Sequence, residues 1–130
     1  MSKRDLLLLT LLIGISCPTF ACNNDGSAAI SVAEFRKDFD GQRQLRGPLT
    51  AAQVEREVIE RMRRQSPDRV PVPSASWYDA WNRLKSKARS QDRFFWFSSP
   101  KESWAAGTGY AGYALVCDRT VIGTVVVAMQ

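Results

Sequence analysis

The clearest periodic pattern in the chain lies between residues 50 and 65. Apolar residues recur one helical turn apart, as at Val54 and Val58, and charged residues cover the other side. Thr50 and Gln53 have the spacing of a capping box, in which each side chain accepts a hydrogen bond from a backbone N–H of the first turn. The pattern predicts an amphipathic helix over 50–65.

A second helix is predicted over residues 76–89, beginning at Ser76 as its cap. Trp77, Trp81 and Leu84 fall on one face of that helix. Such an aromatic stripe is typical of a core, so we expect both tryptophans to be buried. A groove lined for a sugar or a peptide is the alternative.

The aromatic stretch RFFWFS predicts a strand over residues 93–98. With a period of two, Phe95 and Phe97 share one face of that strand, and Phe94 and Trp96 share the other. Large aromatic residues on both faces favour a central strand or an exposed binding face.

Two further strands, near 111–117 and 121–128, are predicted to form a hairpin around Asp118, Arg119 and Thr120. This turn contains no glycine, which favours a loop longer than two residues. The chain is therefore expected to have an α+β fold, in which two main helices pack on a small antiparallel sheet that ends in a C-terminal β-hairpin. A short helix around 31–39 is also expected.

The N-terminus has the pattern of a secretory signal. Lys3 and Arg4 precede an apolar run that ends at Ile15. That run is too short to cross a bilayer, which requires about 20 residues. A basic start, a short apolar run and small residues after it are typical of a signal peptide. We assign the signal to residues 1–16, or as far as 21 if cleavage follows Ala21.

Two cysteines are alternatives for a lipid anchor. Residues 14–17, GISC, resemble a loose bacterial lipobox, which favours lipidation of Cys17. Cleavage after residue 21 would instead leave Cys22 at the N-terminus, with or without lipid. In either case we expect a flexible tether over 17–29 and a single domain over 30–130.

Cys22 and Cys117 could pair, because an exported chain folds in an oxidising compartment. We nevertheless expect no essential disulfide, since a bond to a tether would constrain only the mobile end of the chain. Cys117 is expected to be a small apolar core residue.

Gly107, Gly109 and Gly112 have the G-x-G-x-x-G spacing of a dinucleotide-binding loop. In a dinucleotide fold the glycines follow a strand and precede a helix. Here the Ser-Pro start of a helical turn, with Ser99 as its expected cap, precedes the glycines, and the β-rich YALVC follows them. We therefore expect no cofactor, and interpret the glycines as a sharp turn that leaves space beside Trp104 or Tyr110.

Composition narrows the chemistry further. The chain has no histidine, which excludes Ser-His-Asp and Cys-His catalysis and makes a metal site unexpected. Neither its acidic residues nor the Ser98–Lys101 spacing identifies a catalytic pair, so we expect no enzyme. The net charge of +5 is mild, and nucleic acid is not an expected partner of an exported protein.

The C-terminal third carries a family resemblance. The pattern FWFSSPxESW, followed by GYALV, a turn and VIGxVVV, resembles a group of small uncharacterised bacterial proteins with an aromatic strand, a Ser-Pro helix and a final hairpin. The resemblance supports an α+β fold and implies no activity.

Size, export and aromatic content together favour a small protein-binding module of the bacterial envelope, such as an inhibitor or an immunity protein. Trp104 and Tyr110 are the predicted partner-binding residues, because aromatic residues dominate binding hot spots. The expected location is the periplasm, with a lipid anchor through Cys17. A structural envelope lipoprotein and a carboxylate-based hydrolase are the alternatives.

Overall fold

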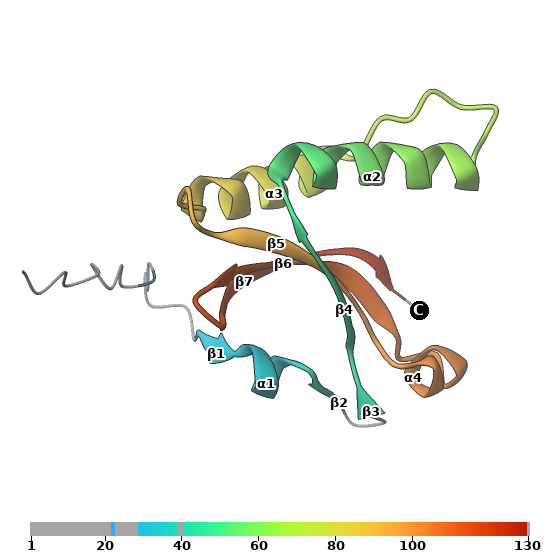
Figure 1. Ribbon diagram of the computed structural model, residues 1–130. Coiled ribbons are helices and arrows are strands. Elements are labelled where there is room, and N and C mark those ends of the chain that lie inside the picture. The colour runs from blue at the N-terminus through green and yellow to red at the C-terminus, as the bar shows by residue number, and fades with distance from the viewer. Residues whose placement is uncertain (1–21, 23–28, 39–40, 130) are drawn as a thin grey trace, which may run out of the picture.

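The structure is a computed structural model, which describes residues 22, 29–38 and 41–129. Within these residues the main sheet is antiparallel and has five strands in the order β1-β7-β6-β5-β4. Helices α2 and α3 form a layer over one face of this sheet (Figure 1). The predicted α+β class is confirmed, with more strands than expected. The strands are β1 (Ile30–Ser31), β4 (Gln44–Leu49), β5 (Arg93–Ser98), β6 (Tyr110–Cys117) and β7 (Thr120–Met129).

Helix α2, Ala51–Gln65, matches its prediction. Thr50 is the N-cap: its side chain accepts from the backbone N–H of Gln53, and the Gln53 side chain accepts from the backbone N–H of Thr50. Val54 and Val58 are the buried residues of the helix and join the core between helices and sheet. The sequence pattern was sufficient to predict this helix because the capping box and the apolar stripe both lie within one segment.

Helix α3, Ala75–Lys87, begins at a different cap from the predicted one. The side chain of Ser74, not Ser76, accepts a hydrogen bond from the backbone N–H of Trp77 at 3.2 Å. Trp81 is buried as expected, and its indole N–H donates to Glu55 of α2 at 2.9 Å. Trp77 is only half-buried, so the expectation of two buried tryptophans is wrong for it.

The aromatic residues of β5 divide between the two faces of the sheet as predicted. Phe94 and Trp96 belong to the core beneath α2 and α3. Phe97 belongs to a second cluster on the opposite face, where its ring lies 5.1 Å from that of Phe35. Phe35 is the buried residue of α1 (Val32–Phe35), which is shorter than the helix expected over 31–39.

The hairpin between β6 and β7 corrects the prediction of a longer loop. Cys117 pairs with Thr120, so only Asp118 and Arg119 form the turn. Their φ angles are 42° and 65°, and positive values at both central residues are the geometry of a type I′ turn. Aspartate tolerates this region, whereas for arginine it is uncommon. The strand pairing on either side therefore imposes the tight turn without glycine.

Strand β4 was missed by sequence analysis, which interpreted Gly47-Pro48 as a break. In the structure Leu45 pairs with Phe97 and Arg46 with Trp96, and the register shifts between Arg46 and Leu49. The segment lies at the sheet edge, and Gly47-Pro48 interrupts it between its two leucines, so it lacks an alternating pattern. Two short strands, β2 (Lys37–Asp38) and β3 (Gly41–Gln42), precede it as a separate antiparallel pair.

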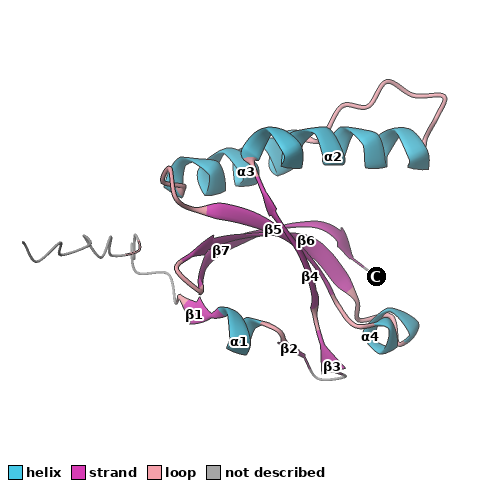
Figure 2. Cartoon of the chain, in the orientation of Figure 1, coloured by secondary structure: helices cyan, strands magenta, loops and turns pink. Residues whose placement is uncertain are grey.

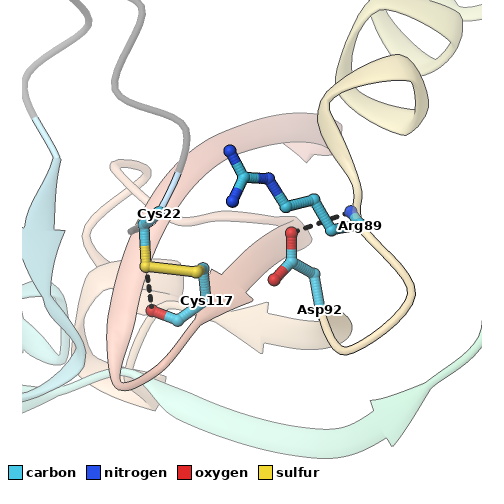
Figure 3. Close-up of a disulfide and its surroundings, with 4 residues drawn as sticks. All are labelled: Cys22, Arg89, Asp92 and Cys117. Atoms are coloured by element: carbon cyan, nitrogen blue, oxygen red, sulfur yellow. Dashed lines mark hydrogen bonds between the residues drawn. A yellow bond between two sulfur atoms is a disulfide. The ribbon is translucent and has the colours of Figure 1, made fainter. Parts of the chain in front are cut away.

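A disulfide joins Cys22 to Cys117, with the two Cα atoms 5.8 Å apart (Figure 3). Cys117 is buried at the end of β6, as a core residue should be. Beside the bond, the backbone N–H of Arg89 donates to the buried carboxylate of Asp92. The expectation of a flexible tether over 17–29 is therefore wrong at Cys22, which is bonded to Cys117 of the sheet, while 17–21 and 23–28 of that tether lie outside the described residues. The signal peptide and Cys17 lie outside the described residues.

Candidate functional site

The predicted partner-binding residue Trp104 lies in α4, Lys101–Ala105, and is half-buried. Its indole ring covers Gly109, where any Cβ would overlap it, and its N–H donates to Ser98 at 3.1 Å. Gly109 therefore leaves the space beside Trp104 that the sequence indicated. These two contacts of the ring are internal to the protein, and its role in binding a partner stays a prediction.

Tyr110, the second predicted residue, is also half-buried and packs within the second core cluster. Its ring lies 5.8 Å from that of Phe97, and the Arg43 guanidinium lies 4.8 Å from the rings of both Tyr110 and Phe35. A cation held between two rings is a stabilising arrangement. These contacts also account for Tyr110 structurally, without bearing on a partner.

The chain enters the glycine segment through a different cap from the expected one. Pro100 is the N-cap of α4. The Ser99 hydroxyl instead donates to the backbone C=O of Tyr110 and accepts from its N–H, each at 3.0 Å. Gly107 has a φ of 75° directly after α4, and β6 follows. A helix before the glycines and a strand after them is the order that the sequence indicated, opposite to a dinucleotide fold.

A second candidate site lies at the outer edge of β7. Among the described residues, β1 pairs with β7 only at Thr120 and Val121. From Ile122 to Met129 the outer side of β7 therefore has no neighbouring strand in the described part of the chain. Such an edge presents backbone N–H and C=O groups to any extended segment that approaches it.

Two cavities accompany this edge. One, of about 370 Å³, runs between α3 and residues 124–127 of β7. The other, of about 240 Å³, lies between the last turns of α2, Pro73 and Val127, and shares Trp77 with the first. We call this region the α3–β7 groove. Its principal lining residues are Arg61, Met62, Pro73, Trp77, Val126 and Val127.

Two buried donors of the α3–β7 groove have no acceptor. The Arg61 guanidinium stacks on Trp96 at 4.0 Å and interacts with Tyr113 and Glu57, but its buried Nη1 has no acceptor in the structure. The indole Nε1 of Trp77 is likewise buried without an acceptor. No Asp or Glu is among the residues that line the two cavities. The groove therefore favours groups that accept hydrogen bonds or carry negative charge.

Exposed apolar side chains surround the same region. Val70 and Val72, in the Pro-rich connection between α2 and α3, are 84% and 66% exposed. That connection bows outward beyond the helix layer (Figure 2). Tyr78 and Val126 are each about two-fifths exposed, at 41% and 40%. Clustered exposed apolar surface is a mark of an interaction site.

Sequence analysis raised a groove beside Trp77 and Trp81 only as an alternative to a core stripe, and it missed the other parts of this groove because they are distant in the chain. Arg61, Trp77 and Val127 lie on two helices and the last strand. One signal was present in the sequence: TVIGTVVVAM carries no charged residue or proline, which are the usual protections of an exposed strand edge.

A cluster of polar side chains joins the helix layer to the sheet. Arg46 donates two hydrogen bonds to the Glu57 carboxylate, at 2.7 and 2.9 Å, and the Tyr113 hydroxyl donates a third at 2.7 Å. The Arg46 bonds hold the pKa of Glu57 below its ordinary value, and burial raises the pKa of Tyr113 to about 12. Glu57 is therefore ionised and Tyr113 neutral near neutral pH, which suits a structural link.

No group of three or more His, Cys, Asp and Glu in the described part of the chain is arranged to hold a metal ion. No helix there has both the length and the apolar character needed to cross a membrane. Comparison with protein-family models, with curated proteins and with solved structures finds no match.

Proposed function

We propose that this protein is a small exported protein-binding module of the bacterial envelope, that it catalyses no reaction, and that it acts as an inhibitor or an immunity protein. The observation that carries the proposal is the α3–β7 groove. Within the described residues it combines a strand edge without a neighbouring strand, buried donors without acceptors, and exposed apolar side chains. A bound protein would cover all three features.

The compartment we propose is the periplasm. The N-terminal pattern supports export, and a Cys22–Cys117 disulfide is typical of an oxidising compartment. A sulfur atom engaged in a disulfide cannot also carry a lipid thioether. The pairing therefore favours Cys17 over Cys22 as the lipid anchor.

Metabolic labelling with palmitate tests this anchor. We expect the wild-type chain to incorporate label, Cys17→Ala to lose it and Cys22→Ala to keep it. Label that is lost only from Cys22→Ala would show that Cys22 carries the lipid. It would contradict both the Cys17 anchor and the Cys22–Cys117 disulfide in the labelled protein. A wild-type chain without label would favour a soluble periplasmic protein.

Photo-cross-linking in living cells tests the partner and its site. A photoreactive amino acid is placed at Tyr78, at the rim of the groove, and in a second variant at Trp104. We expect an adduct with another envelope protein from position 78, because that side chain is exposed beside the groove. A third variant, at Arg83, is the control, since that residue is also exposed on α3 but lines neither cavity of the groove.

An adduct from position 104 alone would move the binding surface to Trp104 and Tyr110. Absence of an adduct at all three positions would contradict a protein-binding role and favour the structural lipoprotein. Hydrolysis of cell-wall material by the purified protein would favour the carboxylate-based hydrolase instead.

A further inference from the structure

The backbone along the outer edge of β7 determines which shape of partner fits. In an antiparallel pair, successive residues direct their N–H and C=O groups alternately toward the neighbouring strand and away from it. Beyond Val121, the outward groups of β7 meet no strand within the described residues. A helix satisfies its own backbone groups and cannot pair with this edge. Only an extended segment presents the matching row of donors and acceptors.

The charge of the groove determines which side chain such a segment would carry. Arg61 lines the cavity next to Val127, and Arg69 lines an adjoining cavity at the connection between α2 and α3. None of the residues that line these cavities, or the one along β7, is acidic. Glu55 lines a further cavity on the Tyr78 side of Trp77, where its carboxylate already accepts from Trp81 and Lys85. With Nη1 of Arg61 and Nε1 of Trp77, which are buried and have no acceptor, this arrangement is complementary to a carboxylate.

We propose that the α3–β7 groove binds an extended acidic segment of a partner protein, which adds to the edge of β7 as a further strand and places an Asp or Glu side chain beside Arg61 and Trp77. The inference rests on the proposed function and specifies the chemistry of the partner. In strand addition, backbone hydrogen bonds supply affinity and pockets for alternate side chains supply specificity. Here the cavity between α2, Pro73 and Val127 is the pocket for the acidic side chain.

A second copy of this chain fits the groove less well. Pairing of two β7 edges would bring the sequence TVIGTVVVAM to the groove, and that strand has no carboxylate for Arg61. Self-association through β7 would leave Nη1 of Arg61 and Nε1 of Trp77 without an acceptor, which is costly for buried groups. The charge therefore favours a different protein as the partner.

Selection from a phage-displayed library of random twelve-residue peptides tests the proposal with the full mature chain as bait. We expect enriched peptides to alternate apolar and polar residues and to contain an Asp or Glu. An enriched peptide is then synthesised with that acid and with its amide counterpart. Loss of the carboxylate should weaken binding to the wild-type protein about tenfold, the size of a charged hydrogen bond.

Matched variants locate the carboxylate. The Arg61→Gln protein should bind the acidic peptide and its amide counterpart equally. The two peptides differ only in the carboxylate, and this variant lacks the guanidinium that would bind that carboxylate. In Arg64→Gln, an exposed residue that lines none of these cavities, the tenfold difference should persist. Comparing the two peptides on each variant removes any general effect of a substitution on folding.

A separate measurement locates the added strand. On binding of the peptide, the backbone amides of 122–129 should gain protection from hydrogen exchange, while those of β5 should not change. Val126→Pro, which removes a donor at the edge, should abolish binding, whereas Val126→Thr should preserve it.

Peptides that bind as helices, that lack an acid, or that leave exchange along β7 unchanged would overturn strand addition while the protein-binding role stands. Self-association lost in Val126→Pro would replace the partner with a second copy. If no peptide is enriched, the inference fails, and cross-linking at Tyr78 decides the proposed function independently.

Discussion

At the scale of single residues, the Glu57 carboxylate makes hydrogen bonds that link three elements of the fold. The Glu57 side chain is 24% exposed, and its carboxylate receives donors from both Arg46 of β4 and Tyr113 of β6. Tyr113 is completely buried, so its hydroxyl depends on this acceptor. One carboxylate thereby joins α2 to two strands that sequence analysis did not connect.

Glu57→Gln should lower the free energy of unfolding by about 1–2 kcal/mol near neutral pH, because charged hydrogen bonds exceed neutral ones in strength. The folded state lowers the pKa of Glu57, first through the Arg46 hydrogen bonds. Its stabilisation is therefore present above the ordinary value of 4.5 and is lost as pH falls through the lowered pKa. Urea unfolding near neutral pH and at about pH 3 should show the difference from wild type shrinking in acid.

The control for this experiment is Glu60→Gln, since Glu60 is exposed on the same helix. Equal losses of unfolding free energy in the two variants would show that Glu57 stabilises the protein only as a charged residue of the helix, and not through its hydrogen bonds. A difference from wild type that grows in acid would contradict the assigned direction of the pKa change.

At the scale of secondary-structure elements, the chain separates into segments that local chemistry determines and segments that depend on pairing. Helix α2 and strand β5 were predicted because the T-x-x-Q cap and the aromatic stretch lie within each segment. Strand β4 lacks an alternating pattern, and only its partner β5 establishes it as a strand. The groove was not predictable either, since tertiary packing brings Arg61, Trp77 and Val127 together.

The start of α3 gives a prediction at this scale. Ser74→Ala should destabilise the protein by about 1 kcal/mol, because it removes the acceptor for the backbone N–H of Trp77. Ser76→Ala should change stability by no more than about 0.5 kcal/mol, the usual range for a surface substitution. Thermal unfolding of both variants measures the comparison. A larger loss of stability in Ser76→Ala would indicate that Ser76 is the cap of the helix, as the sequence pattern favoured.

At the scale of the whole molecule, the Cys22–Cys117 disulfide determines how the N-terminal part of the chain joins the sheet. It links residues separated by 95 positions, and Cys117 lies at the end of β6, next to the turn into β7. Residues 30 and 31 form β1 on the start of β7. The bond thereby fixes Cys22 at the end of β6, beside the strand with which β1 pairs, and the expectation of a flexible tether did not include this.

Reduction should therefore lower the free energy of unfolding by about 2–4 kcal/mol, because the bond closes a loop of nearly the whole domain and restricts the unfolded chain. Urea unfolding with and without reductant measures this loss. The experiment uses a Cys17→Ser background, so that no third cysteine can exchange with the pair. Adding Cys22→Ser should produce the same loss without reductant and remove any further effect of reduction. If the oxidised and reduced proteins instead unfold at the same urea concentration, the bond contributes nothing to stability, and the original expectation of a dispensable disulfide stands.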